Sequence, residues 1–312
     1  DREQLTSLAR TCSGIGDAIP TVLTMTVVPI LGAGSSMADY RIGFKWWALI
    51  IAVVFVISEL VCVACVPERP VACDEKPGKI SDMFKALFKN DQAMTVVVSI
   101  ILVYTSLNIC GNLVLYFFRF DVGNEGAYSI FAAVAFAAQV LVMMVIPLLR
   151  KRFSKSQLFI SGFIIQIAGF AVILIMAFAK LYTPQSWYIL CLPGILIYLG
   201  YGMLNVIMTI FLSDSVDYGE VMNGTREESV IFSMQTFTVK LASGVAVFLA
   251  GLVVDWIHLD TAAAVQTQDT LDALRMWMTI PSVILLIVGI FVFKRFYKLD
   301  DTRMEEIKSK LN

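Results

Sequence analysis

Eight stretches of this chain are apolar over about twenty residues each, and polar connections separate them. A helix needs about 20 apolar residues to cross the hydrocarbon core of a bilayer. The pattern therefore predicts an all-α membrane protein with about eight transmembrane helices. The predicted spans cover residues 12–33, 46–66, 93–118, 128–149, 157–180, 187–212, 228–254 and 276–296.

The composition agrees with this pattern. Of the 312 residues, 58% are hydrophobic and 16% are charged, whereas soluble domains average about 25% charged residues. The net charge of -1 offers no electrostatic footprint for nucleic acid. The bilayer is therefore an expected partner, and nucleic acid is not.

Lysine and arginine are distributed unevenly between the two sides of the predicted membrane. One side receives residues 1–11, 67–92, 150–156, 213–227 and the tail from Lys294, which together carry 18 cations. The other side carries 5, and Lys240 lies inside a span. Because the excess marks the cytoplasmic face, we expect a multi-pass protein of the cell (inner) membrane with both ends of this chain inside.

The connection at residues 67–92 is the longest on the expected cytoplasmic side and separates two helices from six. Six helices as a unit suggest the six-plus-six architecture of major facilitator transporters. Residues 1–66 would end the first half, 67–92 would be the central cytoplasmic loop, 93–297 the second half and 298–312 a cytoplasmic tail. Because the chain starts at Asp1 rather than methionine, we expect an N-terminally truncated fold that lacks four helices.

Metal and disulfide chemistry is not expected. Cys62 and Cys65 form a CxxC, but it lies in the apolar run LVCVACV without a second pair, and His258 is the only histidine. A zinc site needs about four ligands. We predict no structural metal and no cofactor. The cysteines are Cys12, Cys62, Cys65, Cys73, Cys110 and Cys191.

A lysine interrupts the otherwise apolar stretch IFSMQTFTVKLASGVAVFLAGLVV. Lys240 shares one helical face with Ser229, Ser233, Thr236 and Ser243, at spacings of 4, 3, 4 and 3 residues. A charge at mid-bilayer costs about 2.5–3.5 kcal/mol on insertion scales. This face is therefore expected to turn away from lipid, toward other helices or a wet cavity.

Three further spans carry polar stripes at the same spacing. Serine and threonine in such stripes often bond to their own backbone, asparagine can join helices or bind a ligand, and Arg10 could snorkel to the interface. These alternatives stay open. The stripes are Arg10, Gly14, Asp17, Thr21 and Thr24; Tyr104, Asn108 and Asn112; and Tyr198, Gly202, Asn205 and Thr209.

The stretch LSDSVDYGEVMNGTREESVIFSMQTFTVKLASG resembles the signature of the glycoside–pentoside–hexuronide:cation symporters, the family of the melibiose permease. That signature has an aspartate, D-Y-G-E, a basic residue, and Q-T followed by lysine. The start, REQL followed by Arg10, resembles the family's fourth-to-fifth-helix loop and fifth-helix arginine. The segments FKNDQ and LYFFRFDVG resemble the family around its seventh helix. The signature residues here are Asp214, Asp217, Glu220, Arg226, Gln235, Thr236 and Lys240.

The resemblance implies a sugar symporter coupled to Na+ or H+ that works by alternating access, with helices five to twelve present. It implies that Arg10, Gln235, Thr236 and Lys240 lie at or near the sugar and cation sites. The cation-binding carboxylates would belong to helices that this chain lacks. Asp17 departs from the melibiose permease, which has a small residue there.

Combining stripes and resemblance gives three sets of candidate residues. The first set is expected to bind a sugar, the second to couple the cation, and the third to form a cytoplasmic gate by pairing with bases of the other half. A solvated hydrophilic loop is the alternative for the third set. The sets are Arg10, Gln235, Thr236, Lys240, Asn108, Asn112 and Asn205; Lys240, Thr236 and Asp17; and Asp214, Asp217, Glu220 and Arg226.

Two alternatives to a sugar symporter stay open. One is a lysolipid transporter of the same fold, which would favour a lateral opening and a more apolar cavity. The other is a transport-inactive truncated or sensor protein. An enzyme is not expected, because the sequence contains one histidine and no nucleophile–base motif. We expect a monomer whose solute is a small sugar or glycoside.

Overall fold

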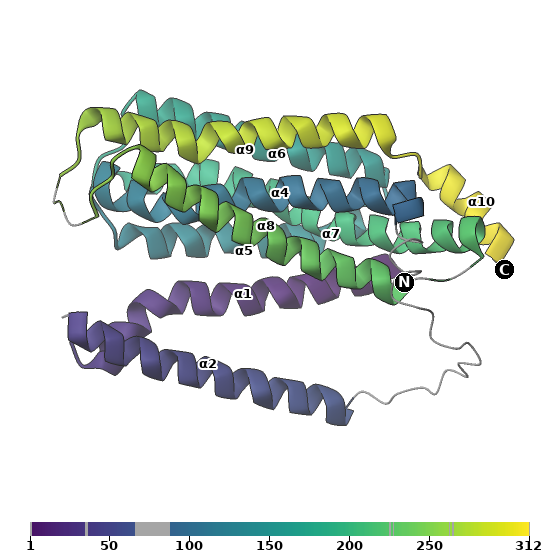
Figure 1. Cartoon of the computed structure of the whole chain (residues 1–312), viewed down its shortest axis with the longest axis horizontal. Coiled ribbons are helices and arrows are strands. Elements are labelled where there is room, and N and C mark those ends of the chain that lie inside the picture. The colour runs from purple at the N-terminus through teal and green to yellow at the C-terminus, as the bar shows by residue number, and fades with distance from the viewer. Residues whose placement is uncertain are drawn as a thin grey trace. The chain divides into compact units, whose positions relative to one another are not determined.

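The protein is built from long helices, and those between residues 91 and 296 run side by side (Figure 1). The computed structural model describes residues 2–34, 37–65, 88–224, 226, 228–261, 263 and 265–311, and within them it has helices and no strand. A π turn, η1 (Phe117–Asp121), continues α4, and a 3-10 turn, η2 (Trp187–Leu190), precedes α7. The α-helices are α1 (Arg2–Gly32), α2 (Met37–Cys65), α4 (Asp91–Tyr116), α5 (Ala127–Leu149), α6 (Lys155–Phe178), α7 (Cys191–Asn223), α8 (Glu228–Trp256), α9 (Gln268–Phe296) and α10 (Asp301–Leu311).

These helices confirm the prediction of an all-α protein with about eight spans. Among the described residues, seven helices are long and apolar enough to cross a membrane. An eighth is obtained when the two pieces of α1, Gln4–Thr24 and Thr26–Gly32, which meet at a 50° bend, are taken as one span. Each predicted span coincides with one helix when η1 and η2 are counted with the helices that they adjoin. The predicted ends extend at most two residues beyond the helix ends.

The chain divides into two compact units. One unit contains Asp1–Gly14 and Ile80–Asn312, and the other contains Ile15–Lys79. In the second unit Trp47 Nε1 donates a hydrogen bond to Thr24 Oγ1 at 2.8 Å. Every residue from 51 to 65 on α2 is exposed. The domain boundaries expected from the sequence stay a prediction, and most of the expected central loop lies outside the described residues.

Close helix contact in the larger unit depends on glycines of α6 and α7. A Cβ atom on Gly200 would lie 2.5 Å from the carbonyl oxygen of Gly162, and one on Gly169 would lie 2.7 Å from a side-chain carbon of Ile197. Small residues let helix backbones approach where no larger side chain fits. Gln166 is fully buried at this contact, and neither of its side-chain amide atoms has a partner among the described residues.

The acidic segment after the sixth predicted span is helical, contrary to the expectation of a connection at residues 213–227. α7 continues to Asn223 and ends at Gly224, whose φ of 72° lies in the left-handed region that glycine adopts without strain. Asp214, Ser215 and Asp217 are buried on this extension. Because basic side chains neutralise these carboxylates, the helix can continue into a polar stretch.

The expected tail begins with a docked helix that the sequence analysis did not predict. Leu299 and two apolar residues of α10, Met304 and Ile307, are buried against Tyr218 and Val221 near the end of α7. Figure 1 shows α10 beside that end of α7. The apolar residues fall on one face of α10, so they could have signalled an amphipathic helix.

Candidate functional site

Thr209 is the centre of a hydrogen-bonded cluster that joins three helices of the larger unit. Arg10 of α1 donates from Nε to Thr209 Oγ1 at 3.0 Å, and Gln235 of α8 donates from Nε2 at 3.1 Å. The Thr209 hydroxyl donates in turn to the Asn205 carbonyl at 3.1 Å. One hydroxyl thus uses both acceptor positions and its donor.

Asn205 continues this cluster toward two tyrosines. Its Nδ2 donates to Tyr104 OH at 2.7 Å and to Tyr201 OH at 3.3 Å. The two rings meet edge to face, with centroids 5.6 Å apart. The other amide atom, Asn205 Oδ1, is buried without a partner among the described residues. A buried acceptor without a donor costs about 1–3 kcal/mol, so a donor from a bound solute would satisfy it.

Gln139 supplies a second acceptor of the same kind beside this cluster. Its Oε1 is buried and has no partner among the described residues. A Cβ atom on Gly202, one turn before Asn205, would lie 3.0 Å from the Gln139 carbonyl. Gln139 Nε2 lies 3.8 Å from where a Cβ on Gly14 would be, one turn after Arg10. Two acceptors from α5 and α7 therefore lie in one region of the unit.

Arg10, Asn205 and Gln235 were predicted from the sequence, and the structure brings them together. Tyr104 and Thr209 were recognised only as members of polar stripes, and Tyr201 was missed. Tyr201 precedes Asn205 by one helical turn, which is the signal that could have identified it.

Lys240 and Thr236 do not join the cluster around Thr209. Both are exposed, and Lys240 makes no hydrogen bond or ion pair with a described residue. Thr236 Oγ1 donates to the backbone carbonyl of Phe232 at 3.4 Å. Gln235 points inward on the other side of α8, because five residues correspond to about 140° of rotation on a helix. Gln235 therefore lies on a different face from Thr236 and Lys240.

The other stripe residues have local partners or lie in the second unit. Asn108 Nδ2 donates to Tyr104 O, and Asn112 Nδ2 donates to Asn108 O, each at 2.7 Å. Both asparagines are half-buried, so their side-chain oxygens are the atoms that could still bind a solute. Asp17 belongs to the second unit, where its side chain is exposed.

The four expected gate residues form ion pairs inside the larger unit. Asp214 pairs with the buried Lys155. Arg226 pairs with Asp217 at 3.2 Å and with Glu220 at 2.7 Å. The pairing expected from the sequence was with bases of the other half. Here Lys155 begins α6 and Arg226 lies in the connection after α7, so these contacts fix the end of α7 within the larger unit.

A second buried ion pair ties η1 to α9, and the sequence analysis did not identify it. Arg275 Nε donates to Asp121 Oδ2 at 2.8 Å, and the two side chains are each 3% exposed. Tyr182, in the connection after α6, donates from its hydroxyl to the same carboxylate. Burial and the Asp121 charge raise the pKa of Tyr182, so this hydroxyl remains a donor.

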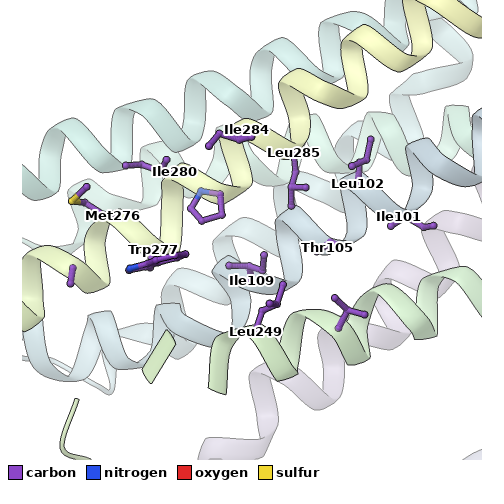
Figure 2. Close-up of a pocket in the computed structure, with 13 residues that line it drawn as sticks. Ile101, Leu102, Thr105, Ile109, Leu249, Met276, Trp277, Ile280, Ile284 and Leu285 are labelled. Carbon is purple, nitrogen blue, oxygen red and sulfur yellow. The ribbon is translucent and has the colours of Figure 1, made fainter. Parts of the chain in front are cut away.

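An apolar cavity of about 750 Å³ lies between α4, α8 and α9 (Figure 2). Figure 2 shows Trp277 and Ile284 of α9, Leu249 of α8 and Ile109 of α4 around it, and Thr105 brings its only hydroxyl group. These side chains cannot pair with the many hydroxyls of a sugar. They suit a hydrocarbon chain.

No group of three or more metal-ligating side chains occurs in the part of the chain that the structure describes. The described cysteines, Cys12, Cys62, Cys65, Cys110 and Cys191, are free thiols. Cys73 lies outside the described residues. The polar cluster around Thr209 consists of amides, hydroxyls and one guanidinium, which are hydrogen-bonding groups.

Helices that are long and apolar enough to cross a membrane, packed around a polar cluster, are typical of a multi-pass membrane protein. The model of the family described as "MFS/sugar transport protein" matches residues 1–301, and the chain belongs to that family. This match confirms the family resemblance found in the sequence.

Three relatives that this chain resembles are named as a carrier, a transporter and a permease. The raffinose carrier protein of Pediococcus pentosaceus is 24% identical over 100% of this chain and 48% of its own length. The isoprimeverose transporter of Lactiplantibacillus pentosus is 24% identical over 96% of this chain and 61% of its own length. The lactose permease of Lactobacillus delbrueckii subsp. bulgaricus is 24% identical over 100% of this chain and 49% of its own length. The chain thus spans about half to three fifths of these relatives.

Proposed function

We propose that the complete protein carries a sugar or glycoside across the membrane by alternating access, together with Na+ or H+. The observation that carries this proposal is the cluster of Arg10, Asn205, Thr209 and Gln235. Its unpartnered oxygen on Asn205, with that of Gln139 nearby, would accept hydrogen bonds from sugar hydroxyls. The names of three relatives, each of which includes a sugar, support this choice of solute.

The coupling ion would act through the exposed face of α8. Lys240 is exposed and has no anionic partner among the described residues, and an ammonium within a predicted span is costly without one. We propose that carboxylates outside this chain face Lys240, with Thr236 and Asp17 as further contributors to coupling. An ion bound at those carboxylates would rearrange the pairing. The membrane potential would add about 2.3 kcal/mol per charge per 100 mV.

Transport by the complete protein tests both parts of this proposal. Lys240→Cys should abolish uphill sugar accumulation because the coupling charge is lost. The measurement is accumulation of labelled raffinose, lactose and a pentoside in vesicles, with a Na+ gradient, an H+ gradient or none. Ser243→Cys, one turn away on the same helix, serves as the control and should retain accumulation. Normal gradient-driven accumulation by Lys240→Cys would reject the coupling role.

The ion pairs at the end of α7 are proposed to act as the cytoplasmic gate. Asp217 is buried and accepts from Arg226, which also holds Glu220. Asp217→Lys would place two cations together and should open this side of the protein in a larger fraction of molecules. The measurement is the alkylation rate of single cysteines introduced on each face of the complete protein. Unchanged rates on both faces would contradict gating.

A lysolipid transporter is the second candidate, and the apolar cavity in Figure 2 favours it. Its walls of Ile, Leu, Met and Trp side chains on three spans suit an acyl chain. Labelled lysolipid offered in the vesicle assay separates the candidates. Uptake of lysolipid without uptake of any sugar would replace the sugar proposal.

We further propose a monomer in the cell membrane with both ends of this chain in the cytoplasm. The cation excess on one set of connections supports this orientation. No enzymatic step and no cofactor other than the coupling ion is needed, because a carrier changes the location of its solute and not its covalent structure.

A further inference from the structure

A cavity lined by cationic side chains lies where α5 gives way to α6. Its volume is about 420 Å³. Residues 150–155 form one wall, and Asp301, Met304 and Glu305 of α10 form another. The docking of α10 on the end of α7 through Met304 and Ile307 holds this second wall in place.

The charges around this cavity do not cancel. Arg150 and Lys155 pair with Asp301 at 3.3 and 3.5 Å, and Lys155 also pairs with Asp214. The remaining two cations, Lys151 and Arg152, are exposed and form no ion pair with a described residue. The Glu305 carboxylate is likewise exposed and unpaired among the described residues. Two cations against one carboxylate leave a positive site.

The candidate spans on either side predict that the cavity lies at a membrane–water interface. α5 ends at Leu149 and α6 begins at Lys155, and both helices are candidate spans, so the connection between them emerges where headgroups are. Leu148 and Phe153 are exposed beside the cations and offer apolar surface to acyl chains. The cation distribution predicts that this side faces the cytoplasm, whose leaflet is rich in anionic lipid.

We propose that this cavity binds the headgroup of an anionic phospholipid from the surrounding bilayer. Lys151 and Arg152 contact the phosphate, which matches their charge, while Glu305 opposes it and limits the affinity. The exposed apolar side chains beside them hold the start of the acyl chains. This proposal stands apart from the transported solute, since it concerns a lipid that stays at the rim of the protein.

Lipid binding to the complete purified protein tests this site. Native mass spectrometry with phosphatidylglycerol or phosphatidylcholine measures the affinity of retained lipid. Lys151→Gln/Arg152→Gln should weaken phosphatidylglycerol binding on the order of tenfold and leave phosphatidylcholine nearly unchanged. Glu305→Gln should strengthen phosphatidylglycerol binding. The control Lys294→Gln/Arg295→Gln removes two exposed cations at the end of α9 and should retain the wild-type affinity.

Three results would overturn the proposal. Equal losses of phosphatidylglycerol affinity in the two double variants would show that the lipid is attracted to cations anywhere on the surface and that the cavity is not a specific site. An unchanged affinity of Lys151→Gln/Arg152→Gln for phosphatidylglycerol would show that these two side chains do not contact the lipid. Thermal unfolding would confirm that the variant is folded. Displacement of the lipid by inorganic phosphate at constant ionic strength would show that a free anion is the ligand and that the bilayer headgroup is not.

Discussion

Replacing Arg275 with methionine should lower the free energy of unfolding by about 3–5 kcal/mol, because it leaves a buried carboxylate without its cation. Arg275 and Asp121 are each 3% exposed and share two hydrogen bonds that join η1 to α9. Methionine keeps most of the apolar stem in place. The measurement is thermal or denaturant unfolding of the protein in lipid nanodiscs.

Two further variants separate a lost ion pair from lost packing. Asp121→Asn combined with Arg275→Met should recover a large part of the stability, because no buried charge is then left uncompensated. Arg119→Met removes the cation of a pair whose side chains are 44% and 54% exposed, and should cost less than about 1 kcal/mol. A double variant as unstable as Arg275→Met alone would contradict this account.

Thr209→Val should weaken sugar binding by the complete protein about tenfold to a hundredfold. Valine has nearly the same shape but cannot accept the hydrogen bonds from Arg10 Nε and Gln235 Nε2. A hydrogen bond that involves a charged group contributes about 1.5–3 kcal/mol. Both donors would then be free to turn away from the solute. Isothermal titration or counterflow with the transported sugar measures the change.

The control for Thr209→Val is a buried threonine whose hydroxyl has only a local role. Thr279 is fully buried on α9, and its hydroxyl donates to the Arg275 carbonyl one turn earlier. Thr279→Val should therefore leave sugar affinity unchanged, while both variants stay folded. Equal losses of affinity in the two variants would show that the cluster around Thr209 does not touch the solute.

The polar stripes show how much of the candidate site could be predicted from the sequence. Helical spacing correctly grouped Asn205 with Thr209, and it placed Arg10 in a polar stripe of its own helix. It could not show that Thr209 would accept from Arg10 and Gln235 at once, because those residues are 199 and 26 positions away in the chain. Only the packing of α1, α7 and α8 brings these side chains together.

The acidic segment shows where residue type misleads. Lys240 stays a predicted coupling residue, on a face of α8 that is exposed in the larger unit while Gln235 points inward. Asp214 and Asp217 indicated a solvated connection, but Lys155 and Arg226 pair with them and α7 continues to Asn223. A cation supplied from another segment is invisible to a local pattern.

The sequence by itself determined that this is a helical membrane protein, where its spans lie and which family it belongs to. These properties depend on local hydrophobicity and on a contiguous motif, and both can be recognised along the chain. The tertiary structure alone decided which polar side chains share hydrogen bonds, which acceptors lack them, and that α10 closes a cationic cavity. Those outcomes depend on how helices rotate and pack, and the packing free energy is summed over contacts between residues far apart in the chain.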